Sequence, residues 1–268
     1  MIIPSEYGLQ TVNGKDTEMS AELQLVMPMA GHGSRFLKNG FEMPKPLIEI
    51  NGKPFFYWSV RSIEKFIDCA GITFVVLGEH VKKFNIDTEV KKYFPYSRIV
   101  SLPDVTEGAA VTCLRGIEGI PAQSPVLFND CDHLFRCSEF NLFSNSMHGI
   151  SPDGALLTFE SSSPAYSYLE YGENGKVIRT VEKQVVSHDA ICGAYYFRSG
   201  ELFQSACEDY FHNCEYKEYF LSGVYNAMIR NGGNVCSFRT DFHLPFGIPE
   251  EYEIAENGEN RWMFDELL

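Results

Sequence analysis

The chain has 268 residues, of which 44% are hydrophobic and 22% charged, a composition typical of a globular protein rather than a disordered or membrane-spanning one. Its 22 basic and 36 acidic residues give a formal net charge of −14, which disfavours binding to nucleic acid or to an anionic membrane. Any anionic ligand must therefore be held by local cations, backbone amides or a metal.

The cysteines and the N-terminal region indicate where the protein works. The eight cysteines form no CxxC pair and lie mostly inside apolar runs, which favours reduced, buried thiols and a cytoplasmic location. The first twenty residues lack a secretory signal, and apolar runs such as residues 72–77 are too short to cross a bilayer. Residues 1–22 are mixed and polar, and we interpret them as an extension ahead of the domain.

The first half alternates predicted strands with predicted helices. Apolar runs predict strands at 25–29, 72–77, 97–102 and 126–128. Apolar residues at helical spacing predict helices at 54–67, 81–93 and 108–117. This order predicts an α/β fold with a mixed, mainly parallel central sheet flanked by helices, of the Rossmann-like nucleotide-binding type.

The second half has a different pattern. It predicts strands at 155–160, 166–171, 176–182 and 192–197, with a turn at 172–175 and a helix-rich tail from residue 201. We expect these strands to form a smaller β-rich lobe on the substrate side. Since no linker separates the two halves, a single domain over residues 23–268 is predicted.

A glycine-rich loop, Gly31-His32-Gly33-Ser34-Arg35, follows the first predicted strand. Two glycines let the backbone turn sharply and bring N–H groups close to a ligand, and an arginine provides donors suited to phosphate. The loop is therefore a candidate phosphate cradle, the alternative being a tight turn with a surface arginine. Phe36 stands where a Rossmann fingerprint needs its third glycine, and no Walker A lysine is present.

The strand predicted at 126–128 ends near two acidic residues, Asp130 and Asp132. Ligands of open α/β sheets bind beyond the carboxyl ends of the strands, and Mg²⁺ is held there by one or two carboxylates together with phosphate oxygens. Asp132 is a candidate metal ligand on this ground. Asp130 either shares that role or forms a turn with its own backbone.

Three spaced elements carry a resemblance: residues 27–36, the segment Met43-Pro-Lys-Pro-Leu-Ile48, and the segment Asn51-Gly-Lys-Pro54. They resemble the sugar-phosphate nucleotidyltransferase family, whose first strand ends in a Gly-x-Gly-x-Arg loop followed by Pro-Lys-Pro-Leu. The resemblance implies catalytic roles for Arg35, Lys45 and Asp132, the last as ligand of a Mg²⁺ cofactor. It further implies nucleotide contacts from Ala30, Gly31, Gly33, Ser34, Glu107, Gly108 and Ala109.

The resemblance extends to the acceptor side. The segment 177–183 resembles the family's strand ending in Glu-Lys-Pro, with Gln184 in place of the proline. By resemblance, Glu182 accepts hydrogen bonds from sugar hydroxyls, Lys183 meets the sugar phosphate, and Gly193 lets a sugar ring approach the backbone. The alternative is that Glu182 and Lys183 form a solvated pair at the strand end.

The closing motif departs from the family. Residues 241–252 resemble Asp-x-Gly-Thr-Pro-Glu-Asp, but Pro245 occupies the place of the aspartate that would be the second magnesium ligand. Asp241 lies four residues earlier and is a weaker candidate for that role. The resemblance covers roughly residues 24–255, with a nucleotide half at 24–135 and an acceptor half at 150–255.

The implied activity is that of a metal-dependent nucleotidyltransferase of nucleotide-sugar and polysaccharide biosynthesis. It joins an NTP and a sugar-1-phosphate, releasing pyrophosphate, so its partners are an NTP and a phosphorylated small molecule. Homo-oligomer formation stays open. Three alternatives also stay open: a cytidylyltransferase for phosphocholine or a polyol phosphate, a GT-A-type glycosyltransferase using Asp130-Cys131-Asp132 as Asp-x-Asp, and a non-catalytic binding module, which Pro245 keeps in view.

Overall fold

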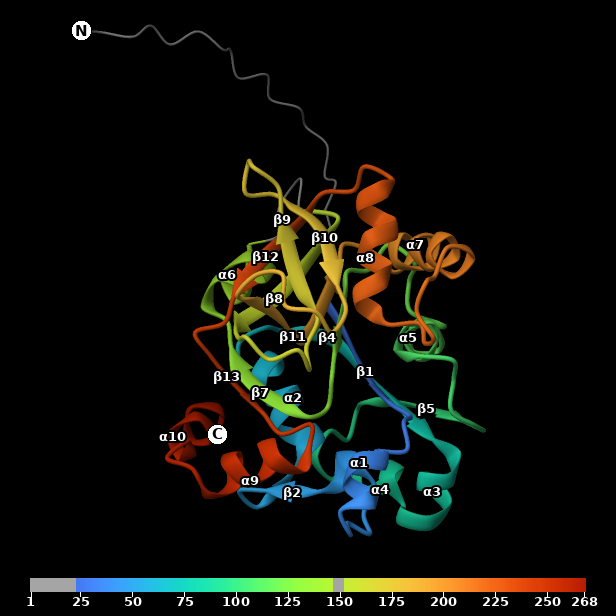
Figure 1. The fold of residues 1–268 in the computed structure, drawn as a ribbon. Helices are drawn as coiled ribbons and strands as arrows, with labels where there is room; N and C mark the ends of the chain where they lie inside the picture. Colours follow the sequence, from blue (N-terminus) through green and yellow to red (C-terminus); the bar gives the residue numbers. More distant parts are fainter. Residues whose placement is uncertain (1–22, 147–151) are drawn as a thin grey trace, which may run out of the picture.

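The computed structural model describes residues 23–146 and 152–268, so the predicted extension at 1–22 lies outside the described residues. A mixed sheet forms the centre of the fold (Figure 1), and four of its strands are parallel neighbours. In spatial order these are β6 (Val126–Asn129), β1 (Leu23–Met29), β4 (Cys69–Leu77) and β5 (Arg98–Leu102). The four strands predicted in the first half are confirmed.

One predicted helix of this half is divided. The helix expected at 81–93 is two helices, α3 (Gly78–Phe84) and α4 (Ile86–Tyr93). Asn85 between them has a φ of 51°, a left-handed conformation that asparagine tolerates and that ends α3. The other helices of this half are α1 (Ser34–Lys38), α2 (Phe55–Glu64), α5 (Ala109–Ile117) and α6 (Ser138–Asn145).

The second half adds antiparallel strands to the sheet. Strand β11 (Asp189–Phe197) runs antiparallel to β6 and joins both β8 (Gly154–Glu160) and β9 (Tyr168–Tyr171). The predicted turn connects β9 to β10 (Val177–Val181), and the Gly172 amide donates across it to the Lys176 carbonyl at 2.9 Å.

The tail from residue 201 is only partly helical. It contains two strands that the sequence did not predict, besides the expected helices. Its elements are α7 (Gly200–His212), α8 (Leu221–Arg230), β12 (Val235–Arg239), β13 (Phe242–Pro245), α9 (Pro249–Asn257) and α10 (Arg261–Leu267). Strand β12 extends the central sheet beside β8, and β13 pairs with β7 (His133–Arg136) outside it.

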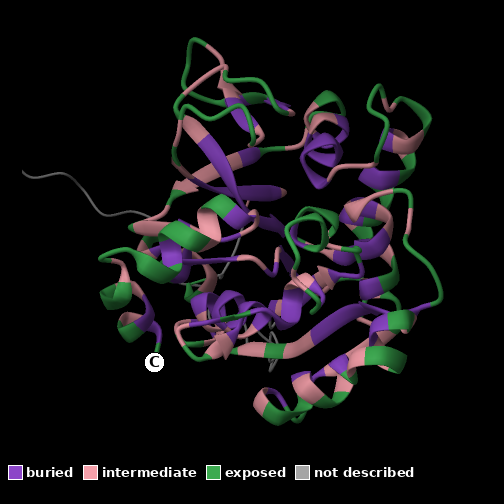
Figure 2. Cartoon of the chain, turned by 60° about the horizontal axis from the view of Figure 1, so that its bottom comes forward, coloured by how far each residue is buried: buried purple, intermediate pink, exposed green. Residues whose placement is uncertain are grey.

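Helices cover both faces of the sheet, and the buried layers in Figure 2 follow the strands. Because side chains alternate along a strand, Val26 packs toward α5, α7 and α8, whereas Leu25 and Met27 pack toward α2, α4 and α6. The predicted fold class, a mixed sheet flanked by helices, is confirmed. In the described residues, no helix has the length and apolar content needed to cross a membrane.

A third apolar cluster holds the β7–β13 ribbon against the loops that follow β1. Trp58 and Phe55 of α2 pack there with Leu244 of β13 and Phe264 of α10. The same cluster includes Phe36 of α1 and Ile50 of the short strand β2 (Glu49–Ile50). Strand β2 follows the 3₁₀ turn η1 (Lys45–Leu47) and pairs with β3 (Lys53–Pro54). This packing fixes the position of the segment that carries Lys45.

Candidate functional site

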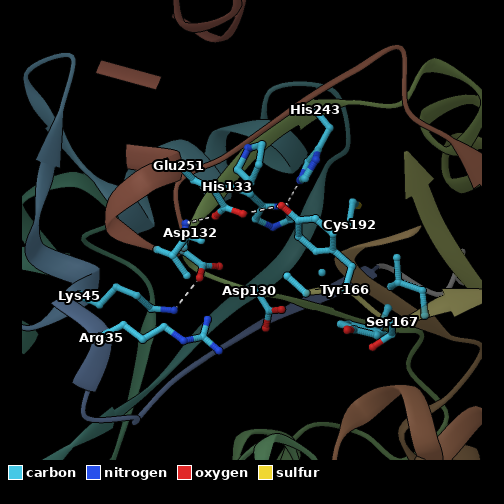
Figure 3. Close-up of a pocket in the computed structure, with 17 residues that line it drawn as sticks. Arg35, Lys45, Asp130, Asp132, His133, Tyr166, Ser167, Cys192, His243 and Glu251 are labelled. Atoms are coloured by element: carbon cyan, nitrogen blue, oxygen red, sulfur yellow. Dashed lines mark hydrogen bonds and ion pairs between the residues drawn. The ribbon is translucent and has the colours of Figure 1, made fainter. Parts of the chain in front are cut away.

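The main candidate site lies where the parallel strands end and the antiparallel half begins. A cavity of about 210 Å³ opens there, and its lining includes Arg35, Lys45, Asp130 and Asp132 (Figure 3). Strands β1 and β6 are parallel, so the loops after both strands reach the same edge of the sheet. An adjoining cavity of about 230 Å³ shares Lys45 and both aspartates, and Gly31 and Gly33 also line it.

Lys45 and Asp132 form the central ion pair of this site. The Lys45 ammonium lies 2.6 Å from an Asp132 carboxylate oxygen, and the two side chains are 26% and 21% exposed. Burial lowers the pKa of Lys45, but the attraction of Asp132 and the neighbouring acidic groups outweighs it and raises the pKa above its ordinary value. Burial acts against ionisation of Asp132 as well, yet Lys45 lowers the pKa of that carboxyl. Both groups are therefore charged near neutral pH.

The glycine loop and the lysine turn lie against each other. Gly33 has a φ of 63°, and a Cβ atom added to it would lie 2.9 Å from the Cβ of Lys45. A side chain at this position would thus be strained and would displace the lysine. No atom lies within 4 Å of the corresponding position at Gly31, so the backbone there is open to a ligand. The structure brings together the two motifs on which the predicted nucleotide site depends.

Asp130 lies beside Asp132 and forms no ion pair with a lysine or arginine of residues 23–146 or 152–268. Burial raises its pKa to about 7, with a further contribution from the charge of Asp132 that Lys45 partly offsets. Within the described residues, no side chain donates a hydrogen bond to its carboxylate. Gly193, whose φ is 94°, gives it room, since an added Cβ would lie 2.8 Å from an Asp130 carboxylate oxygen.

The donor set fits a divalent cation that is completed by substrate phosphates. In the described parts of the chain, no three His, Cys, Asp or Glu side chains gather in a way that could hold a metal ion alone. Two neighbouring carboxylates, Asp130 and Asp132, are nevertheless the number that Mg²⁺ takes beside phosphate oxygens. Their like charges and the raised pKa of Asp130 leave a site that an additional cation would stabilise.

The structure corrects the expectation for Asp241. Pro245 pairs in register with His133, the residue after Asp132, and lines the cavity without offering a ligand. Asp241 lies four residues back along the ribbon, roughly 13 Å at the usual rise of a strand. Its carboxylate accepts hydrogen bonds from the backbone and hydroxyl of Ser138 and lies 3.5 Å from Arg136. Asp241 therefore does not replace the missing ligand.

The buried His133 and the partly buried His243 form part of the cavity wall. The Asn129 amide group donates to the Ser59 carbonyl at 2.9 Å, so its oxygen faces Nε2 of His133 at 3.1 Å. Nε2 of His133 must then carry a proton, and Nδ1 is left to accept from Nε2 of His243 at 3.2 Å. Burial lowers the pKa of His133 to about 4 and that of His243 well below its ordinary value. Both imidazoles are neutral near pH 7.

The predicted acceptor residues Glu182 and Lys183 do not themselves line the cavity. Glu182 is only 10% exposed and accepts hydrogen bonds from the hydroxyls of Ser167 and Ser222. The Lys183 ammonium lies 3.8 Å from Glu182 and 4.7 Å from the centre of the Phe220 ring. Among the predicted acceptor residues, Gly193 is the one in the cavity lining.

The turn predicted to contact the nucleobase packs against the backbone of a neighbouring segment in the structure. The backbone of Tyr219 crosses Gly108, and an added Cβ there would lie 2.4 Å from the Tyr219 nitrogen. The Ala110 amide donates to the Tyr219 carbonyl at 2.9 Å, and the Tyr219 amide donates to the Glu107 carbonyl at 3.1 Å. Close backbone packing thus accounts for the glycine, and the cavity linings described above do not include Glu107, Gly108 or Ala109.

Several cavity residues lie outside the motifs used for prediction. The Tyr166 hydroxyl donates to Glu251, whose other carboxylate oxygen accepts from the Gly247 amide at 2.9 Å (Figure 3). The sequence held one signal for Glu251, because an acidic residue two places after Pro249 in the first turn of a helix commonly binds a backbone amide just before that helix. Tyr166 and its neighbour Ser167 were predicted to begin a strand, but β9 begins at Tyr168 and the two residues lie in the loop before it. No motif marked them as site residues.

A scan against models of protein families finds no match for this sequence, and a search of curated proteins finds none either. Solved structures do match. The nucleoside-diphosphate-sugar pyrophosphorylase from Vibrio cholerae RC9 aligns with a TM-score of 0.72 and 25% identity, over 86% of this chain and 98% of that chain.

Two further matches have lower identity. The inositol-1-phosphate CTP transferase from T. maritima aligns with a TM-score of 0.69 and 14% identity, over 88% of this chain and 95% of that one. A Bacillus anthracis protein described as a glucose-1-phosphate thymidylyltransferase aligns with a TM-score of 0.70 and 15% identity, over 87% and 94%. The chain has the fold of the nucleotidyltransferase family, and the predicted resemblance to that family is confirmed.

Proposed function

We propose that the chain is a metal-dependent nucleotidyltransferase that joins an NTP to a sugar-1-phosphate or a related phosphate monoester and releases pyrophosphate. The observation that carries the proposal is the convergence of Arg35, Lys45 and two aspartates on one cavity edge, beside a glycine loop with open backbone. The similarity to sugar pyrophosphorylase and CTP transferase structures supports it.

The reaction is attack by a phosphate oxygen of the acceptor on the α-phosphorus of the NTP. A new bond forms between this oxygen and the α-phosphorus. The bond between the α-phosphorus and the oxygen that bridges the α- and β-phosphates breaks, and pyrophosphate leaves with its electron pair. The nucleophile is anionic near neutral pH because the second pKa of a phosphate monoester is about 6, so no general base is required. The task of the protein is to neutralise charge and to align the three groups.

Arg35 and Lys45 serve that task. Arg35 is exposed at the mouth of the cavity, where its planar group can bind two phosphate oxygens. Lys45 is held in place by its ion pair and by prolines on both sides, so its charge is positioned before substrate arrives. Asp132 and Asp130 would hold Mg²⁺, which when bound neutralises phosphate charge.

The proposal includes the predicted division of the domain into a part that binds the nucleotide and a part that binds the acceptor. Residues 24–135 would form the nucleotide half and residues 150–255 the acceptor half of a single domain. A cytoplasmic location is also proposed, supported by the eight free cysteines.

Pyrophosphate release tests the proposal. The purified protein would be incubated with ATP, CTP, GTP, UTP or dTTP and a panel of sugar-1-phosphates and other phosphate monoesters, with Mg²⁺ or with EDTA. We expect release that depends on one NTP, one acceptor and the metal. Release without acceptor, or turnover of a nucleotide-sugar with a non-phosphorylated acceptor, would instead point to a hydrolase or a glycosyltransferase.

A further inference from the structure

The charge of the cavity wall is uneven. Arg35 and Lys45 lie on the nucleotide side, whereas the wall formed by residues 165–167 and 243–251 has no lysine or arginine in its described lining. That wall contains Glu251, which forms no ion pair with any lysine or arginine in the described chain. His243, which also lines it, is neutral near pH 7 because burial lowers its pKa. This part of the wall is therefore negatively charged. It packs against Asp132, since a Cβ atom added to Gly247 would lie 2.5 Å from an Asp132 carboxylate oxygen.

The two hydroxyl hydrogens of this wall already have acceptors. The hydroxyl of Tyr166 donates to Glu251, and the hydroxyl of Ser167 donates to Glu182. What these two hydroxyls can present to a ligand is oxygen lone pairs. A sugar hydroxyl both donates and accepts hydrogen bonds, whereas an ammonium group only donates them. An ammonium group would also supply the positive charge that pairs with the Glu251 carboxylate.

On the basis of the proposed function, we propose that the acceptor is a phosphate monoester that carries a protonated primary amine, and that Glu251 binds this amine. The phosphate of such an acceptor would face Lys45, and its ammonium would face Glu251. Glu251 is well placed for this role because the Gly247 amide and the Tyr166 hydroxyl hold its carboxylate at the cavity, one on each oxygen (Figure 3). Each oxygen keeps a further lone pair for the ligand.

Matched acceptors test the charge requirement directly. Glucosamine-1-phosphate and glucose-1-phosphate differ by an ammonium in place of a hydroxyl, as do phosphoethanolamine and 2-hydroxyethyl phosphate. Calorimetry with Mg²⁺ and no NTP measures binding of all four, independently of turnover. We expect the amine to bind at least about tenfold more tightly in one pair or both, which corresponds to about 1.4 kcal/mol.

Two variants assign the effect to Glu251. Glu251→Gln keeps an oxygen that can accept from Gly247 but removes the charge, and it should reduce the preference for the amine to less than threefold. Glu250→Gln makes the same charge change on the next residue of α9, which is exposed and outside the cavity lining, and should keep the preference. Equal or tighter binding of the hydroxyl in both pairs, no binding of either amine, or an unchanged preference in Glu251→Gln would overturn the proposal.

Pyrophosphate release separates this inference from the proposed function. If the amine preference holds and no NTP yields pyrophosphate, the nucleotidyltransferase assignment fails and the cationic ligand stands. If an NTP yields pyrophosphate and neither amine binds more tightly than its matched hydroxyl compound, the assignment stands and the inference about the amine is wrong.

Discussion

Replacing Asp130 with asparagine should stabilise the metal-free protein. The Asp130→Asn substitution keeps the size of the side chain and removes a charge that lies beside Asp132 and has no ion pair in the described part of the chain. Burial and Asp132 raise the pKa of Asp130 to about 7, against about 3.9 in an unfolded chain. A carboxyl shifted in this direction stabilises the fold only where it is protonated, so its ionisation opposes folding as pH rises.

The size and pH window follow from these two pKa values. The cost is absent below about pH 4, grows between pH 4 and 7, and is constant above pH 7. A shift of this size corresponds to at most about 4 kcal/mol. We expect about 2 kcal/mol, because one side of Asp130 faces an open cavity where solvent screens the charge. For a protein of this size that is an increase of about 4–8 °C in melting temperature at pH 8, and less than half as much at pH 5.

Thermal unfolding in EDTA at pH 5 and pH 8 measures the effect. Asp265→Asn, an exposed position in α10 with no ion pair in the described chain, is the control and should leave the melting temperature unchanged at both values. Adding Mg²⁺ should stabilise the parent protein more than Asp130→Asn. An equal or lower melting temperature for Asp130→Asn at pH 8 would refute this account of the two aspartates.

Three other substitutions follow from the same geometry. Lys45→Met should lower turnover by about 10²-fold and the free energy of unfolding by about 2 kcal/mol, because it leaves Asp132 without its partner. Adding Asp132→Asn should restore the free energy of unfolding, measured with urea, but not the turnover. Arg35→Ala should reduce turnover with a melting temperature within about 2 °C of the parent, since the side chain is exposed; unchanged kinetics would remove it from the site. Gly108→Ala should cost about 2–4 kcal/mol through collision with backbone, whereas Gly31→Ala should leave stability nearly unchanged; equal urea midpoints would contradict this.

The sequence predicted the part of the fold that depends on local patterns. The four parallel strands are apolar runs, and α2 and α5 have apolar residues at helical spacing, so each was recognisable alone. The ribbon of β7 and β13 was not, because its strands are short, lie 106 or more residues apart, and owe their structure to each other and to α9 and α10. The break at Asn85 was missed because asparagine is permitted, but not required, to adopt a left-handed conformation.

The same distinction separates the site residues. Gly33 and Lys45 belong to contiguous motifs, and the structure places them in contact. Asp241 was considered because it is the acidic residue nearest to Pro245 in this stretch of sequence, yet four residues of extended strand carry it away from the cavity. Tyr166 and Glu251 come from segments 85 residues apart, and only folding brings the hydroxyl to the carboxylate.

Under the proposed function, the distribution of charge would let a chain with a net charge of −14 select a ligand that is itself anionic. Arg35 and Lys45 are the lysine and arginine side chains in the described cavity lining, and Glu251 and the oxygen of Tyr166 belong to the wall that packs against Asp132. A ligand with phosphate at one end and ammonium at the other would place its phosphate at Lys45 and its ammonium at Glu251, whereas the reversed orientation would place like charges together. The same distribution would disfavour a second polyphosphate beside Glu251, so the NTP and the acceptor would not compete for that wall.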